Sequence, residues 1–233
     1  MSNSSLICYT AISPHKKIRN HKIDTITIHC MACNGSIETC GRAFQMNTVA
    51  SSNYGIGSDG RIALYVPEEY RSMCSSNSAN DNRAITIEVA NLTNYEPFSV
   101  SEKAYNSLIS LLVDICKRNG IEKLLWKADK SLIGQVDKQN MTVHRWFANK
   151  SCPGTYLFEK HYQIAEEVNE RLESELAVRY KTIYDVPEPL REETRQLIES
   201  GALRGNEKGL DVTEDMLRCM IINKRYVDGL IEK

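Results

Sequence analysis

Two short stretches of the sequence alternate β-branched residues with other residues, which is the pattern of strands in a sheet. They are residues 25–29 (TITIH) and 83–89 (RAITIEV). Between them, residues 54–56 and 61–64 flank Gly57-Ser58-Asp59-Gly60, and its Asp-Gly step is a strong β-hairpin signal. The alternation therefore predicts several strands that belong to one sheet.

Apolar residues at helical spacing predict a helix within residues 99–120. Ser99 and Glu102 have the spacing of a capping box, and Gly120 is suited to end the helix. The apolar residues of this segment fall on one helical face, which is typical of a helix packed against a sheet. They are Leu108, Leu111, Leu112 and Ile115.

Two more helices are predicted on either side of this segment. One begins after Ser36 and spans about fifteen residues, with the serine hydroxyl as its cap. Another runs through residues 161–176, and Pro153 is suited to its first turn. Because strands and helices intermix, with helices packed over the strands, we expect an α/β domain over residues 1–178.

The predicted first domain ends near Tyr180, where the sequence no longer favours a continuous helix. Two prolines follow closely in YKTIYDVPEPL and obstruct a helix, so this stretch is interpreted as a linker. Beyond it, amphipathic stretches at residues 191–200 and 213–226 predict a small all-α module, so that linker and module occupy residues 179–233. Two short helices bury little surface alone, so we expect this tail to pack on the first domain, on another copy of itself, or on a target.

Composition and charge limit which partners and which cellular compartment we expect for the protein. The 233 residues carry a formal charge of −1 with 25% charged residues, which disfavours nucleic acid because phosphate binding needs a concentrated basic surface. No segment approaches the roughly 18 to 20 apolar residues that span a bilayer, and no basic-then-apolar signal peptide opens the chain. We therefore expect a soluble chain made in the cytoplasm, without membrane insertion, whose eight cysteines are mostly reduced.

Three residues have the types that bind zinc. His29 ends one predicted strand, and His144 lies eight residues before Cys152 in a segment that Pro153 and Gly154 mark as tightly turned. Each histidine alone would more often be structural. Two imidazoles and one thiolate together, however, leave the fourth tetrahedral position of zinc open for water, which is typical of a catalytic site.

Four stretches now carry a family resemblance: TITIHCMA, SSNYGIGSDGRI, NRAITIEVAN and TVHRWFANKSCPG. In this order they resemble the type-2 N-acetylmuramoyl-L-alanine amidases, which include phage lysozyme-type amidases and animal peptidoglycan recognition proteins. The resemblance implies a mixed central β-sheet flanked by α-helices, with Zn²⁺ held by His29, His144 and Cys152 at the floor of a groove. It also implies a substrate, the amide between the lactyl group of N-acetylmuramic acid and L-alanine in peptidoglycan.

The resemblance further implies three catalytic candidates. Glu88 matches a functional glutamate of bacterial members, Tyr54 matches a tyrosine that phage members place near the metal, and Lys150 could approach the developing oxyanion. The alternatives are an outward-facing strand carboxylate, a tyrosine packed in the core, and a solvated loop lysine. Which of the three is the general base stays open.

Other residues are given structural roles. Cys30 and Cys33 form a lone CxxC that we interpret as incidental thiols, and His15, His21 and His161 lack matching partners.

The tail from Tyr180 onward resembles a single S-layer-homology-type helical module, as on clostridial and phage amidases. We expect it to bind the wall or to form a homo-oligomer; a passive extension packed on the catalytic domain is the alternative. The whole chain is then interpreted as a phage endolysin or prophage-derived autolysin of a Gram-positive system. It would reach the bacterial cell wall through a permeabilised membrane. The alternative is a non-catalytic peptidoglycan-binding or regulatory protein on the same fold.

Overall fold

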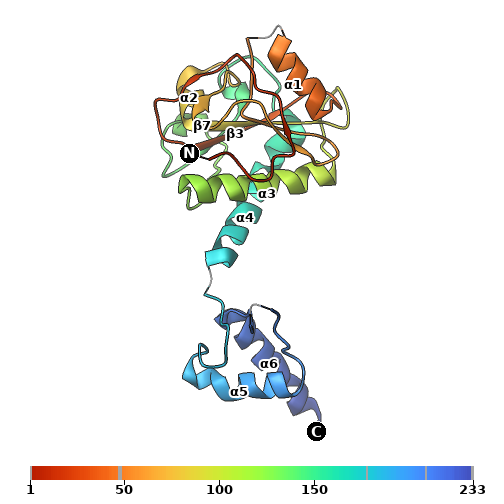
Figure 1. Cartoon of the computed structure of the whole chain (residues 1–233), viewed down its shortest axis with the longest axis vertical. Coiled ribbons are helices and arrows are strands. Elements are labelled where there is room, and N and C mark those ends of the chain that lie inside the picture. The colour runs from red at the N-terminus through yellow and green to blue at the C-terminus, as the bar shows by residue number, and fades with distance from the viewer. Residues whose placement is uncertain (1, 47–48, 177, 208, 232–233) are drawn as a thin grey trace. The chain divides into compact units, whose positions relative to one another are not determined.

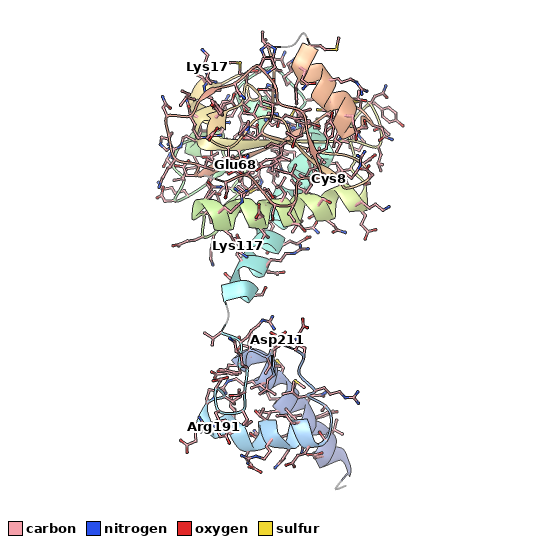
Figure 2. All side chains as sticks on the ribbon, viewed as in Figure 1. Cys8, Lys17, Glu68, Lys117, Arg191 and Asp211 are labelled. Atoms are coloured by element: carbon pink, nitrogen blue, oxygen red, sulfur yellow. The ribbon has the colours of Figure 1, made fainter. Side chains whose placement is uncertain are left out.

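The computed structural model describes residues 2–46, 49–176, 178–207 and 209–231. The chain divides into two compact units, Met1–Leu172 and Glu173–Lys233 (Figure 1). Figure 2 shows the side chains of both units; Glu68 belongs to the first unit, and Arg191 and Asp211 belong to the second. No helix among the described residues is both long and apolar enough to cross a bilayer.

A six-stranded mixed sheet forms the centre of the first unit, in the order β1-β5-β4-β7-β3-β8. β3 lies between β7 and β8 and runs parallel to both, whereas β4 is parallel to β7 and antiparallel to β5. The strands are β1 (Tyr9–Thr10), β3 (Thr25–Cys30), β4 (Tyr54–Ile56), β5 (Ile62–Leu64), β7 (Ala84–Val89) and β8 (Met141–Thr142). A separate two-stranded sheet pairs β2 (Lys17–Ile18) with β6 (Tyr70–Arg71). The prediction of a mixed sheet is confirmed.

The β4–β5 hairpin closes through the predicted Asp-Gly turn. Gly60 has φ +85°, a conformation that glycine adopts without steric cost, and its N–H donates to the carbonyl of Gly57 at 2.9 Å. The Asp59 carboxylate accepts the N–H of Arg61 at 3.0 Å. This turn brings the two strands into antiparallel register, with Tyr54 opposite Leu64.

Helices flank the sheet on both sides (Figure 1). α1 (Ile37–Met46) covers the first part of the predicted helix; residues 47–48 lie outside the described residues, and residues 49–50 are not helical. The six-residue α2 (Ser78–Arg83) was not predicted. α3 (Glu102–Asn119) ends at Gly120 as expected, with φ +66°. Its N-cap, however, is Ser101 rather than Ser99, because the Ser101 hydroxyl accepts the N–H of Ala104 at 3.0 Å. The last helix of this unit's fold is α4 (Gly154–Leu176), which crosses the boundary between the units.

The two faces of the sheet have different chemistry because successive side chains of a strand point to opposite faces. On one face, isoleucines of β3 and β7 pack with apolar residues of α3 and α4 in the main core. On the other face lie Thr27 and His29 of β3 and Thr86 and Glu88 of β7, in matching register. The sheet therefore has one apolar face and one polar face, and the polar face carries the titratable side chains of His29 and Glu88.

The second unit contains α5 (Glu188–Glu199) and α6 (Glu214–Ile231) and has a core of its own. The buried apolar residues of this core come from both helices and from the segments around them: Tyr180, Val186, Leu190, Leu197, Leu203, Val212, Leu217 and Ile221. Arg191 donates to the carbonyls of Val186 and Tyr184, which ties a loop to α5. The second unit therefore buries apolar residues of its own, with loop residues contributing to the core, and its packing on a further surface stays a prediction.

Candidate functional site

His29, His144 and Cys152 come together at the carboxyl-terminal edge of the sheet. His29 is the penultimate residue of β3, and His144 follows the adjacent parallel strand β8 in a 3₁₀ turn, His144–Trp146. Cys152 lies just before α4, and its carbonyl accepts the N–H of Arg145 at 3.1 Å. Parallel neighbours and this loop-closing hydrogen bond bring residues from remote parts of the chain to one point.

The ligand atoms of these three residues lie within 4.8 Å of one another. Nδ1 of His29 is 3.3 Å from Sγ of Cys152, and the two imidazole rings have centroids 5.1 Å apart. The structure thus brings together the three residues that the sequence singles out as metal ligands.

Both histidines are held neutral by their surroundings. Burial lowers the pKa of His29 to about 3, and the charge of His144 adds to this effect. The pKa of His144 is also lowered, first by burial and then by the positive charge of Lys150. Neutral imidazoles keep a free lone pair, which a metal ligand needs.

Glu88 lies beside His29, since the two residues are partners in the β3–β7 register. Its Oε1 is 3.6 Å from Sγ of Cys74, and its Oε2 is buried without a partner among the described residues. Burial, and then the charge of Cys30, raise the pKa of Glu88 to about 8. A carboxyl group with a pKa near neutrality and an unpaired oxygen is suited to proton transfer.

Lys150 lies in the exposed loop before Cys152. Together with His144, Ser76 and Arg71 it lines a cavity of about 380 Å³. Its positive charge lies close enough to His144 to lower the pKa of that imidazole.

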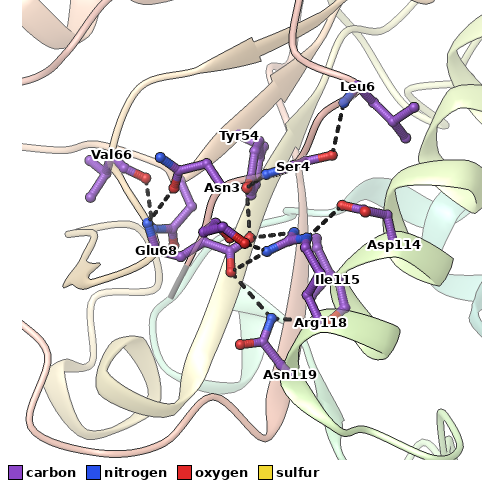
Figure 3. A network of polar contacts seen from close by, with 12 residues as sticks. Asn3, Ser4, Leu6, Tyr54, Val66, Glu68, Asp114, Ile115, Arg118 and Asn119 are labelled. Carbon is purple, nitrogen blue, oxygen red and sulfur yellow. Dashed lines mark hydrogen bonds and ion pairs between the residues drawn. The ribbon is translucent and has the colours of Figure 1, made fainter.

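Tyr54 is not part of this cluster, which corrects the expectation taken from the family resemblance. It pairs with Ile87, so its side chain lies on the face of the sheet that packs against α3, opposite to Glu88. The buried hydroxyl donates to Oε1 of Glu68 at 2.6 Å and accepts the N–H of Ser4 at 3.0 Å (Figure 3). Tyr54 is therefore a tyrosine packed in the core, which was the alternative to a catalytic role.

All eight cysteines are free. The backbone N–H of Cys30, which does not depend on its thiol, points to Sγ of Cys152 at 3.5 Å. Cys33 is exposed, and His161 is buried in α4 with Nδ1 2.6 Å from the carbonyl oxygen of Leu157.

Sequence reasoning missed one segment of the site. Cys74, Ser75 and Ser76, in the loop before α2, approach Glu88, His29 and His144 respectively. Cys74 also forms a second group of potential ligands with His29 and Glu88, again within 4.8 Å. No periodic pattern marks these loop residues, because only the folded chain brings them to the site.

The structure shows a mixed α/β fold with a cluster of potential metal ligands at one edge of the sheet, and the comparison with protein families identifies the class. The family described as N-acetylmuramoyl-L-alanine amidase matches residues 19–155. The match spans more than half of the chain, so the protein belongs to the type-2 N-acetylmuramoyl-L-alanine amidase family. The second unit lies outside the match, and its resemblance to helical wall modules stays a prediction.

Solved structures of similar fold have low sequence identity to the chain. A selenomethionine derivative of AmpD has a TM-score of 0.53 with 16% identity, covering 70% of this chain and 96% of its own. PlyL has a TM-score of 0.51 with 15% identity, and the match covers 69% of this chain and 95% of PlyL. A mutant endolysin from Bacillus subtilis has a TM-score of 0.50 with 16% identity, and the match covers 69% of this chain and 97% of the endolysin. At these identities the likeness establishes the fold alone. No curated protein matched the chain.

Proposed function

We propose that the protein is a zinc-dependent amidase that cleaves the lactyl amide bond between N-acetylmuramic acid and L-alanine of peptidoglycan. The observation that carries the proposal is the convergence of His29, His144 and Cys152, with ligand atoms within 4.8 Å, in a chain of the amidase family. Family membership supports the reaction, and the cluster supports the metal.

The donor set fits zinc. Imidazole nitrogen and thiolate sulfur are the ligands that zinc prefers, and three protein ligands leave one position open for water or substrate. The second nitrogen of each imidazole also has a partner, because Nε2 of His29 lies 3.4 Å from Ser75 Oγ and Nε2 of His144 lies 2.9 Å from Ser76 Oγ. Ligand histidines usually have such a partner on the nitrogen that does not bind the metal.

Zinc bound at this site would lower the pKa of a water molecule and polarise the scissile carbonyl. Glu88 is suited to take the proton of the attacking water and then to deliver it to the departing amine of L-alanine. Its raised pKa supports both directions of transfer, since neither protonation state is strongly preferred near neutral pH. The ammonium of Lys150 would stabilise the negative charge that develops on the carbonyl oxygen.

Two features of the biological role belong to the same proposal. We assign residues 1–178 to catalysis and residues 179–233 to a linker and module that binds the wall or self-associates. The separate core of the second unit supports a module with its own role. We further propose that the protein is an endolysin or autolysin of phage or prophage origin, which meets the wall through a permeabilised membrane.

Digestion of purified cell walls tests the reaction. The full chain should release new L-alanine amino termini without new reducing sugars, and a chelator should stop this release until zinc is restored. Wall binding without any released amino termini would instead establish the non-catalytic peptidoglycan-binding alternative. Release that continues in chelator would contradict the zinc mechanism.

The role of the tail has its own test. The full chain is compared with residues 1–178 by gel filtration and by co-sedimentation with cell walls. Self-association through the tail is supported if the ratio of apparent mass to the mass of one chain is smaller for the short form than for the full chain. Wall binding by the tail is supported if the short form is retained less on cell walls. Unchanged values for both would contradict an active role for the second unit.

A further inference from the structure

Three consecutive residues in the loop between β6 and α2 each contact a different group of the proposed active site. Sγ of Cys74 is 3.6 Å from Oε1 of Glu88. Oγ of Ser75 is 3.4 Å from Nε2 of His29, and Oγ of Ser76 is 2.9 Å from Nε2 of His144. One short segment therefore reaches both histidine ligands and the candidate base.

The backbone of this segment is fixed by a buried carboxylate. Asp81 of α2 accepts the N–H of Cys74 at 3.2 Å and the N–H of Ser75 at 3.1 Å. The carbonyl of Asp81 in turn accepts a hydrogen bond from the guanidinium of Arg19 at 2.9 Å. Ser76 adopts φ +59°, which is uncommon for a residue other than glycine and is kept here by the structure around it.

The hydroxyl of Ser75 is itself oriented. The Asn80 amide donates to Oγ of Ser75 at 3.0 Å, while its carbonyl oxygen accepts from the hydroxyl of Thr142 at 2.9 Å. Ser75 and Asn80 are both buried, so this chain of hydrogen bonds is shielded from water. The position of Oγ next to His29 is thus set by the fold.

We propose that Cys74-Ser75-Ser76 is a positioning segment that fixes the tautomers of His29 and His144 and the orientation of Glu88. Each serine accepts a hydrogen bond from the Nε2–H of its histidine, which leaves Nδ1 of both rings unprotonated and available as a ligand. Nδ1 of His29 already faces Sγ of Cys152 at 3.3 Å. The Cys74 thiol donates to Oε1 of Glu88. The inference rests on the proposed zinc site, because it concerns how this site is held.

The tautomers give a direct test that needs no metal. In the metal-free full chain near neutral pH, imidazole ¹⁵N NMR should show His29 and His144 protonated at Nε2. In Ser75→Ala the signal of His29 should shift toward a mixture of tautomers while His144 stays unchanged, and Ser76→Gly should do the converse. Protonation at Nδ1 in the wild-type chain would overturn the proposal.

Zinc affinity gives the second test, by competition with a chromogenic chelator. Ser75→Ala and Ser76→Gly should each raise the zinc Kd by roughly 10- to 100-fold, as expected when a partner of a ligand histidine is removed. Glycine at position 76 also removes the strain of the positive φ, so this variant keeps the loop folded. Ser110→Ala is the matched control, because its hydroxyl donates to the Asn106 carbonyl within α3.

Cys74 should behave differently from the serines. Cys74→Ala is expected to keep the wild-type zinc Kd but to lower kcat about tenfold at unchanged KM, since it contacts the base and not the ligand nitrogens. Cys74→Ser should restore part of kcat because it retains a donor.

These outcomes separate the two proposals. Zinc Kd values of both serine variants within twofold of wild type, in chains with wild-type circular dichroism, would overturn the positioning role alone. A wild-type chain that binds no zinc while both histidines are Nε2-protonated would contradict the proposed zinc mechanism and leave the tautomer assignment supported.

Discussion

Two glutamates, one on each side of the sheet, have opposite surroundings: Glu88 belongs to β7, and Glu68 lies in the turn before β6 and pairs with Arg118 of α3. Glu68 is fully buried, and four donors surround its carboxylate. Oε1 accepts from the Tyr54 hydroxyl at 2.6 Å and from Arg118 at 2.7 Å, and Oε2 accepts from Arg118 at 2.9 Å and Asn119 at 3.2 Å (Figure 3). Among the described residues, the hydrogen bond found for the Glu88 carboxylate comes from the Cys74 thiol to one oxygen, and the other oxygen has no partner.

The difference separates a structural carboxylate from a chemically available one. A buried carboxylate that accepts four hydrogen bonds holds β4 and α3 together, through Tyr54 on one side and Arg118 and Asn119 on the other. A carboxylate that burial leaves poorly solvated and unpaired is ready to exchange a proton. We therefore expect changes at Glu68 to affect stability, and changes at Glu88 to affect catalysis.

The largest effect is expected from removal of a zinc ligand on the Glu88 face. His29→Ala or Cys152→Ala should lose the bound metal and reduce wall hydrolysis by at least about 10⁴-fold, because two ligands retain zinc poorly. Metal content by mass spectrometry and release of L-alanine amino termini measure both effects. Cys219→Ala, an exposed cysteine of α6, is the control. Retained zinc with full activity in either ligand variant would refute the assignment.

Glu88→Gln should lower kcat by roughly 10² to 10⁴ while zinc stays bound, as is typical for loss of a general base. The wild-type rate should rise with pH, because only the ionised carboxylate accepts a proton. Burial raises the pKa of Glu88 from 4.5 to about 8, and the charge of a bound cation acts in the opposite direction, so the midpoint should lie between these values. A rising limb that persists unchanged in Glu88→Gln would assign the titration to another group.

Glu68→Gln should leave the chemistry intact and destabilise the fold. The change removes one of the two carboxylate partners of Arg118, which keeps Asp114 at 2.9 Å. Loss of hydrogen bonds to a charged group costs about 1.5–3 kcal/mol. Urea unfolding measures this loss, and kcat per folded molecule should match wild type. A variant as stable as wild type but catalytically impaired would reverse the comparison.

Lys150→Ala should reduce kcat about 10²-fold without loss of zinc, since it removes one positive charge from the developing oxyanion. Lys138→Ala provides a matched control in another exposed loop, where the ammonium binds the side chain of Gln135. Equal rates for the two variants would make Lys150 a solvated surface residue.

Tyr54→Phe is expected to have the smallest effect, a loss of about 1–3 kcal/mol in the free energy of unfolding, because it leaves the buried N–H of Ser4 unpaired. Steady-state kinetics should be unchanged. A large fall in kcat in a variant as stable as the wild type would indicate a catalytic role for Tyr54. It would contradict the placement of this residue on the α3 face of the sheet.

The fold was predictable where a local pattern determines it. Alternation in β3 and β7, the Asp-Gly turn and the terminal Gly120 each act over a few residues, and the structure confirms them. α2 escaped prediction because its sequence, SANDNR, has no apolar periodicity. Its start is set instead by the N-cap Asn77, whose side chain accepts the N–H of Asn80.

The site was predictable in residue type and less so in geometry. Histidine and cysteine ligands are rare enough to be noticed in a sequence, whereas their meeting depends on the parallel pairing of β3 and β8. Tyr54 shows the limit, since a shift of one position along a strand exchanges the faces of the sheet. The two serines of the positioning segment are ordinary loop residues until the fold brings them to the imidazoles.

Diffraction data collected at the zinc absorption edge test the central claim most directly. We predict one zinc ion bound by His29, His144 and Cys152, with nitrogen ligands at about 2.0–2.1 Å and sulfur at about 2.3 Å. Zinc held instead by His29, Cys74 and Glu88, or no zinc in a protein that still cleaves the wall, would contradict the account.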